Sequence, residues 1–112
     1  MIQHHDLAAG RWWELSIAQQ LGNIGSEISR ANRWKTRKPE MMEAAVFRAL
    51  ELFDLTLSDP RHRPFRCRLR EIARAREVVA DFFLGANQFS WTAEALQKYF
   101  DAFAVAARNG GG

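Results

Sequence analysis

Residues 16–31 read SIAQQLGNIGSEISRA, and this stretch decides the predicted fold. Ser16 followed three residues later by Gln19 matches a capping box, in which two side chains satisfy free backbone groups at the start of a helix. Apolar residues then recur at intervals of three and four, which places them on one helical face. They are Ile17, Leu21, Ile24, Ile28 and Ala31. The stretch predicts an amphipathic helix that begins at Ser16.

Small residues form a second row beside that apolar face. They are Ala18, Gly22, Gly25 and Ser29. A glycine inside a helix costs about 1 kcal/mol relative to alanine, so something should offset two of them. Close approach of another backbone would do so, either from a neighbouring helix of the same chain or from a second subunit. The row is therefore a candidate seam for helix packing or for formation of a homo-oligomer.

Three further helices are predicted along the chain. Pro39 suits the first turn of the second helix, and Pro64 helps to open the third. Gly85 with Asn87 is expected to end the third helix, and Ser90 to cap the fourth. The apolar faces are broad and are expected to include Met41, Met42, Val46, Phe53, Phe65, Ile72, Val79, Phe83, Leu96 and Phe100.

Short connections between four helical segments favour antiparallel neighbours. The expected fold is therefore all-α, an up-down four-helix bundle over residues 16–108. Residues 1–15 are predicted to be an N-terminal extension, in which at least one of Trp12 and Trp13 covers the end of the bundle. Residues 109–112 are expected to be a disordered tail.

Charge is distributed unevenly along the 112 residues, whose formal net charge is +3. Residues 16–38 carry five Lys and Arg against one Glu, which gives +4. Residues 39–59 carry five acidic residues against Arg48, which gives −4, and residues 60–77 carry seven arginines against two glutamates, which gives +5. An acidic helix thus lies in sequence between two basic segments, and part of this charge is expected to be paired internally.

The arginines of residues 60–77 are the main candidate for a binding surface. Arg63, Arg66, Arg70 and Arg74 follow one another at three, four and four residues, so their guanidinium groups are expected to line one helical face over about 17 Å. Such a row suits phosphate groups. The alternative is that these arginines pair with the acidic second helix, with Glu71 and Glu77, or with solvent. Both interpretations stay open from the sequence.

A second group of basic residues surrounds Trp34. Arg33, Lys35 and Arg37 are expected to extend the nucleic-acid-binding surface, and Trp34 to stack on bases or to fill an edge of the core.

The sequence contains no complete motif for metal binding or catalysis. His4, His5 and Asp6 are residue types that bind metals or serve a metal-dependent hydrolase, but too few further ligands accompany them. Cys67 is the single cysteine of the sequence, so it cannot form an internal disulfide. There is no Walker loop, dinucleotide fingerprint or nucleophile elbow. No catalytic residue, metal or cofactor is predicted, and the chain is not expected to be an enzyme. Without an apolar run long enough for a membrane span or a signal peptide, the chain is expected to be cytoplasmic with no membrane partner.

Three stretches resemble a family of small uncharacterised prokaryotic helical proteins: LSIAQQLGNIGSE at residues 15–27, RALELFDLT at residues 48–56 and REVVADFF at residues 76–83. That resemblance covers about residues 12–108 and implies a helical fold without an assigned activity. In length, basicity and helix count the chain is also similar to four-helix-bundle accessory proteins of retroelement reverse transcriptases and of ribosomal RNA intervening sequences.

The leading hypothesis is a non-enzymatic accessory module that binds the backbone of RNA or DNA through its arginines. The rival is a protein-interaction or self-assembly module whose seam is the row of small residues on the first predicted helix. A third hypothesis is a hydrolase that acts through His4, His5 and Asp6. It predicts loss of activity when residues 1–10 are removed.

Overall fold

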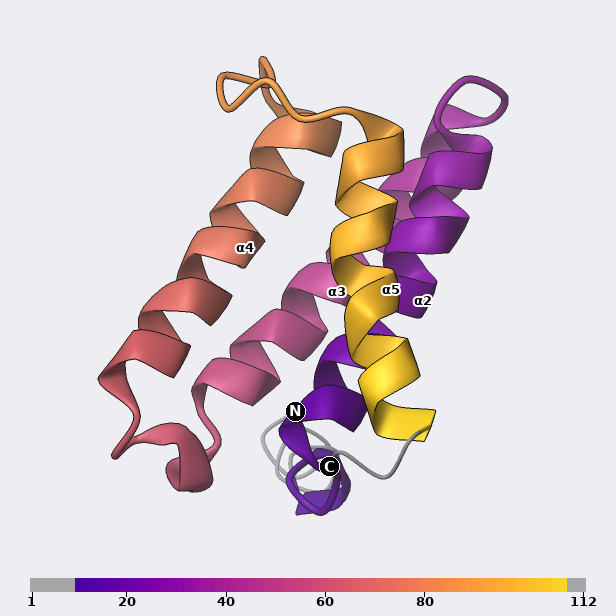
Figure 1. Cartoon of the computed structure of the whole chain (residues 1–112). Coiled ribbons are helices and arrows are strands. Elements are labelled where there is room, and N and C mark those ends of the chain that lie inside the picture. Colours follow the sequence, from indigo (N-terminus) through magenta and orange to yellow (C-terminus); the bar gives the residue numbers. More distant parts are fainter. Residues whose placement is uncertain (1–9, 109–112) are drawn as a thin grey trace.

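In a computed structural model that describes residues 10–108, a helical turn at residues 10–12 precedes four long helices and one short 3-10 helix (Figure 1). They are α2 (Ile17–Trp34), α3 (Pro39–Leu57), η1 (Pro60–His62), α4 (Arg66–Leu84) and α5 (Ala93–Arg108). Residues 10–108 contain no β-strand. The prediction of an all-α fold is confirmed.

The starts of α2 and α3 agree with the sequence signals. Ser16 Oγ accepts from the backbone N–H of Gln19 at 3.1 Å, and Gln19 Oε1 accepts from the backbone N–H of Ser16 at 2.9 Å. These two bonds complete the predicted capping box. Pro39 occupies the first position of α3, where its missing N–H leaves no helical hydrogen bond unmade.

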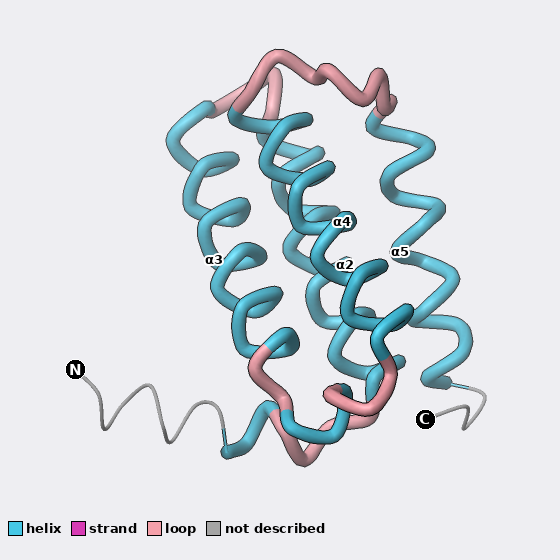
Figure 2. Tube along the Cα trace, turned by 90° about the vertical axis from the view of Figure 1, so that its left-hand side faces the viewer, coloured by secondary structure: helices cyan, strands magenta, loops and turns pink. Residues whose placement is uncertain are grey.

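The helices are arranged so that one side of the fold is open. α2 lies against both α3 and α5, and α3 lies against α4. The backbones of α4 and α5 hardly approach one another, although these helices are consecutive in the chain (Figures 1 and 2). A hollow between the two helices is lined by side chains of both, among them Val78 of α4 and Phe100 of α5.

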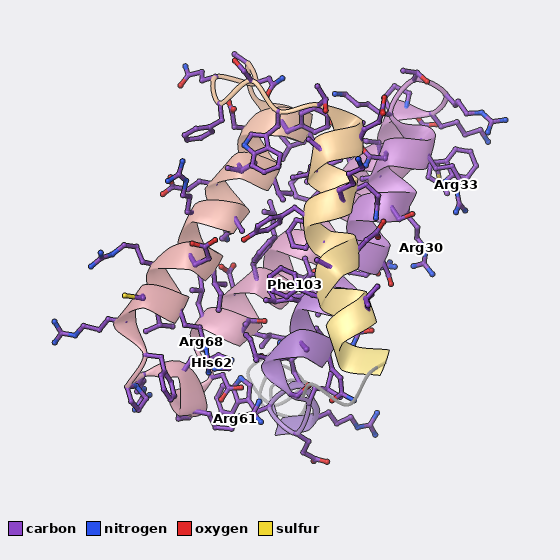
Figure 3. All side chains as sticks on the ribbon, viewed as in Figure 1. Arg30, Arg33, Arg61, His62, Arg68 and Phe103 are labelled. Atoms are coloured by element: carbon purple, nitrogen blue, oxygen red, sulfur yellow. The ribbon has the colours of Figure 1, made fainter. Side chains whose placement is uncertain are left out.

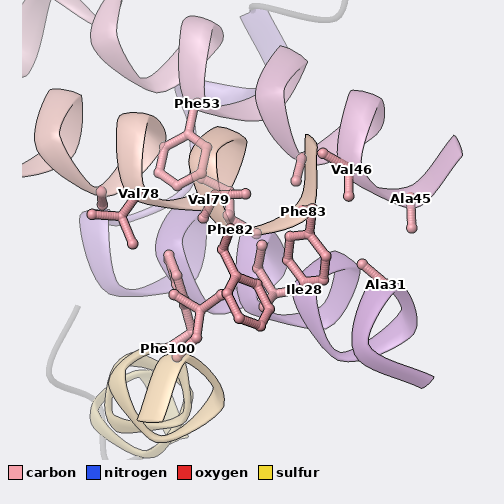
Figure 4. Close-up of a cluster of buried hydrophobic side chains, with 14 of the residues drawn as sticks. Ile28, Ala31, Ala45, Val46, Phe53, Val78, Val79, Phe82, Phe83 and Phe100 are labelled. Atoms are coloured by element: carbon pink, nitrogen blue, oxygen red, sulfur yellow. The ribbon is translucent and has the colours of Figure 1, made fainter. Parts of the chain in front are cut away.

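The core gathers apolar side chains from all four long helices (Figure 4). Phe53 of α3 and Phe100 of α5 are both almost fully buried and meet edge to face, with ring centroids 6.0 Å apart. Edge-to-face contact suits the quadrupoles of two aromatic rings. This pair bridges the fold at its centre and ties α5 to the α3 side.

The row of small residues on α2 is occupied by α5 of the same chain. A Cβ built at Gly22 would lie 3.5 Å from Cα of Ala104, and one built at Gly25 would lie 2.9 Å from Cβ of Phe100. Ala18 is buried, and Ser29 borders a hollow between α2 and α5. The close approach of α5 accounts for both glycines, since a side chain at Gly25 would force the helices apart.

The N-terminal tryptophans lie against the end of α3. Trp12 is 8% exposed, and its indole Nε1 donates to Thr56 Oγ1 at 2.8 Å. Trp13 Nε1 donates to the carbonyl of Leu55, also at 2.8 Å. At least one tryptophan therefore covers the end of the helices, as predicted, and residues 12 and 13 are part of the packed structure.

Three local predictions are wrong. Ser90 does not cap α5: Thr92 Oγ1 accepts from the N–H of Ala95, while Ser90 lies in the left-handed region with φ 59°. Met41 is 44% exposed and Phe65 is 51% exposed, so neither belongs to the core. Phe65 stands just before the first turn of α4, where its ring stacks on the guanidinium of Arg68 instead.

The core side of α4 is also broader than its predicted apolar face. The additional buried residues are Ala75, Val78 and Phe82. Ala75 and Val78 line the hollow beside α5, whereas the ring of Phe82 lies under Lys35. Within residues 10–108, none of the helices combines the length and the apolar character needed to cross a bilayer.

Candidate nucleic-acid interface

The seven arginines of residues 61–76 divide into two groups in the structure. Three of them have partners within the fold. Arg76 donates through Nε to Asp54 Oδ1 at 2.8 Å and through Nη2 to Asp54 Oδ2 at 3.2 Å, which joins α4 to α3. Arg61 holds the carboxylate of Asp59, and Arg68 lies over the ring of Phe65 with its Nη1 3.4 Å from Nδ1 of His62.

The other four are those of the predicted row: Arg63, Arg66, Arg70 and Arg74. All four are exposed. No hydrogen bond or ion pair joins their guanidinium groups to another residue in the described part of the chain. The alternative that the acidic second helix neutralises the arginines thus holds for Arg76 and not for this row.

The row is shorter as a helical feature than the sequence predicts. α4 begins at Arg66, so Arg63 lies in the turn after η1 and not on the helix. Arg66, Arg70 and Arg74 remain at four-residue intervals on one face, and their Cα atoms span about 12 Å at 1.5 Å per residue. We call these three residues the α4 arginine row.

Carboxylates near the row are largely engaged elsewhere. Glu71 Oε1 accepts from the hydroxyl of Tyr99 at 3.2 Å, and Asp81 Oδ2 accepts from the backbone N–H of Phe89 at 3.1 Å. Glu77 is exposed one turn beyond Arg74 and limits the basic surface to the first half of α4. Positive charge is therefore concentrated at the N-terminal half of this helix.

The second basic group does not join the row, which corrects the prediction of a single surface. Arg33 lies in the last turn of α2, and Lys35 and Arg37 follow it before α3 begins. Figure 3 shows Arg33 at the opposite end of the fold from Arg61 and Arg68. Lys35 Nζ lies 3.6 Å from the centroid of the Phe82 ring, so this lysine caps the core. Arg37 lies 5.8 Å from the ring of Trp34.

A cavity borders the row where α4 and α5 stand apart. Its volume is about 200 Å³, and its apolar part comes from Ala75, Val78, Leu96 and Phe100. Trp91 and Tyr99 add aromatic walls, and the charged side chains of Glu71 and Arg74 lie at its edge. Burial, together with the charge and the hydrogen bond of neighbouring Glu71, raises the pKa of Tyr99 to about 12. Tyr99 is thus a neutral hydroxyl group at physiological pH.

A buried polar cluster that no sequence pattern predicted lies next to the start of α4. It consists of Gln20, Asp59 and His62, none of them more than 2% exposed. Gln20 Nε2 donates to Asp59 Oδ2 at 2.9 Å and to the carbonyl of Trp12 at 3.0 Å. Gln20 Oε1 is 2.9 Å from His62 Nε2. The cluster joins α2, η1 and the N-terminal segment.

The hydrogen bonds fix the state of His62. Because both protons of the Gln20 amide are directed to acceptors, its oxygen accepts and His62 Nε2 carries the proton. Nδ1 is then the acceptor toward Arg68. Burial lowers the pKa of His62, Asp59 raises it, and Arg68 and Arg61 lower it. The ring is neutral, and its burial leaves no access for a substrate.

Asp59 keeps its charge inside this cluster. Burial alone would raise the pKa of Asp59, but hydrogen bonds from Arg61 and Gln20 outweigh burial and lower the pKa to about 2. Asp59 Oδ1 also accepts from the backbone N–H of Arg61 and so caps η1. The cluster therefore fixes η1 in place and with it the chain that leads to Arg63 and Arg66.

Other sequence candidates are placed as follows. Cys67 is an exposed free thiol. Among the residues described, no group of three or more His, Cys, Asp and Glu side chains could hold a metal ion. His4, His5 and Asp6, like the predicted tail at residues 109–112, lie outside the described range.

Comparison of the chain with protein-family models, with curated proteins and with solved structures finds no match. The resemblance to small prokaryotic helical proteins and to accessory proteins of retroelements therefore stays a prediction. The geometry of the arginines and of the cavity beside them is the basis for a proposed function.

Proposed function

We propose that the protein is a non-enzymatic module that binds the phosphate backbone of RNA or DNA through the α4 arginine row, with Arg63 at its end. The observation that carries this proposal is the division among the arginines. Arg61, Arg68 and Arg76 have partners in the fold, whereas every member of the row extends into solvent. Guanidinium groups form bidentate hydrogen bonds to phosphate oxygens, and successive contacts release counterions from the nucleic-acid backbone.

The fold supports this role by holding the row rigidly. Arg76 anchors one flank of α4 to Asp54, and the buried cluster around His62 fixes the segment from which α4 starts. We further propose that the four long helices form an up-down bundle that stays open between α4 and α5. An accessory role, a cytoplasmic location and the absence of a cofactor or metal belong to the same proposal.

The rival hypothesis is a protein-interaction or self-assembly module whose seam is the small-residue row of α2. Gly22 and Gly25 face Ala104 and Phe100 of α5 within one chain. Because α5 faces these two glycines, the arginines of α4 support the proposed function better than this row does.

Binding of a fluorescein-labelled oligonucleotide, followed by fluorescence anisotropy at low salt, tests the proposal. Changing Arg66, Arg70 and Arg74 together to Gln should weaken binding at least tenfold, since each phosphate contact contributes on the order of 1 kcal/mol. Arg33, Arg37 and Lys38 changed to Gln form the matched control, with the same change in net charge at the other end of the fold. Equal loss in both variants, or no binding by the unaltered chain, would refute the proposal.

A further inference from the structure

The cavity between α4 and α5 lies directly beside the α4 arginine row, and Arg74 belongs to both. Its volume of about 200 Å³ is below the roughly 300–1,000 Å³ of pockets for drug-sized ligands. The cavity therefore has room for about one flat ring system. Its lining is aromatic and aliphatic apart from the hydroxyl of Tyr99 and the charged side chains of Glu71 and Arg74.

We propose that this cavity receives one unpaired nucleobase of a strand whose phosphates lie on the α4 arginine row. This inference rests on the proposed function and adds a substrate class, single-stranded RNA or DNA. Bases in such strands stack on aromatic side chains while the backbone follows a basic surface. Trp91 and Tyr99 supply the aromatic surface, and Arg74 supplies the link to the backbone.

The edge of the cavity has groups that suit the polar edge of a base. Glu71 carboxylate oxygens accept hydrogen bonds, as from an exocyclic amino group, and the Arg74 guanidinium donates to ring nitrogens or carbonyls. Tyr99 already donates to Glu71 and so orients that carboxylate. Glu71 and Arg74 together offer an acceptor and a donor to the edge of one ring, which an apolar peptide side chain would leave unused.

Duplex nucleic acid cannot use this site without disruption, because its bases are paired and stacked inside the helix. The inference therefore predicts a preference for single strands over duplexes of equal length. A surface that recognises phosphates alone would not distinguish a single strand with bases from one without them.

Two fluorescein-labelled strands with the same number of phosphates test the inference, one with bases and one built from abasic nucleotides. Their affinities for the unaltered chain are measured by fluorescence anisotropy at one low salt concentration. We expect the strand with bases to bind about tenfold more tightly, in line with the contribution of one stacked base. Ala75→Leu, which fills the cavity, should remove this difference and leave binding of the abasic strand unchanged.

Each outcome has a separate meaning. Equal affinity of the unaltered chain for the two strands overturns the base site but leaves the phosphate-binding function in place. Failure of both strands to bind refutes the proposed function, and the base site falls with it. Because the comparison of strands uses the unaltered chain, it decides the question even if Ala75→Leu, checked by its helical circular dichroism spectrum, does not fold.

Discussion

Arg74 and Arg76 are two residues apart on α4, yet they serve opposite flanks of the helix. At roughly 100° per residue, two steps turn the side chain by about 200°. Arg76 faces α3 and forms a bidentate ion pair with Asp54, whereas Arg74 borders the cavity beside α5. This difference separates an arginine that holds the fold together from one that is available to a ligand.

The two glycines of α2 should respond differently to alanine. A Cβ at Gly22 meets Ala104 at an ordinary 3.5 Å, so Gly22→Ala should raise the free energy of unfolding by up to about 1 kcal/mol through helix propensity. A Cβ at Gly25 would lie 2.9 Å from Phe100 Cβ. Overpacking there costs about 1–3 kcal/mol, so Gly25→Ala should lower the free energy by up to about 2 kcal/mol. Urea denaturation measures both, and equal effects would show that α5 does not pack on this face.

Thr92 and Ser90 test where α5 begins. Thr92→Ala removes the hydroxyl that accepts from Ala95 N–H and should lower the free energy of unfolding by about 1 kcal/mol. Ser90→Gly should leave it unchanged or raise it by up to about 1 kcal/mol, since glycine tolerates the positive φ at this position. Thermal denaturation of the two variants shows whether Thr92 or Ser90 caps α5. If Ser90→Gly were the more damaging change, Ser90 would be the cap.

The buried cluster makes stability depend on pH in the acid range. His62 has a lowered pKa when folded, so the unfolded chain binds more protons once the pH drops below about 6.5. The free energy of unfolding should therefore be highest above that pH and should fall as the pH decreases, until folded His62 is itself protonated. Asp59, with a folded pKa of about 2 against an ordinary value of 3.8, adds a further loss as the pH falls from 3.8 toward 2.

Urea denaturation at about pH 7.5 and at about pH 5 measures the contribution of His62. His62→Gln is the control, since it keeps a polar side chain and removes the titrating ring. The variant should lose less stability than the unaltered chain between these two pH values. Equal losses would mean that His62 is not held neutral by its surroundings.

Much of the fold follows from local signals in the sequence. The capping box at Ser16 and the proline at position 39 mark helix starts by backbone chemistry that acts within three or four residues, so both were predictable. Ser90 was mistaken for a cap because side-chain hydrogen bonds within the loop from Gly85 to Trp91 set its shape: Asn87 bonds to both N–H and C=O of Trp91. Such bonds leave no periodic pattern in the sequence.

The candidate site was predicted only in part, for the same physical reason. Spacing alone placed Arg66, Arg70 and Arg74 on one helical face. It could not show that Asp54 engages Arg76, because that partner lies 22 residues away. The cavity and the His62 cluster combine residues from elements distant in sequence, such as Gln20 with His62, 42 residues apart. Only the packing of the helices brings them together.

The salt dependence of binding tests the central claim most directly. For single strands, the slope of the logarithm of the binding constant against the logarithm of salt concentration is about −0.7 for each phosphate neutralised. Replacing Arg66, Arg70 and Arg74 by Gln should therefore make the slope shallower by about 2, whereas the control variant at Arg33, Arg37 and Lys38 keeps the original slope. The same slope in all three proteins would contradict the account, since the arginines of α4 would then not contact phosphates.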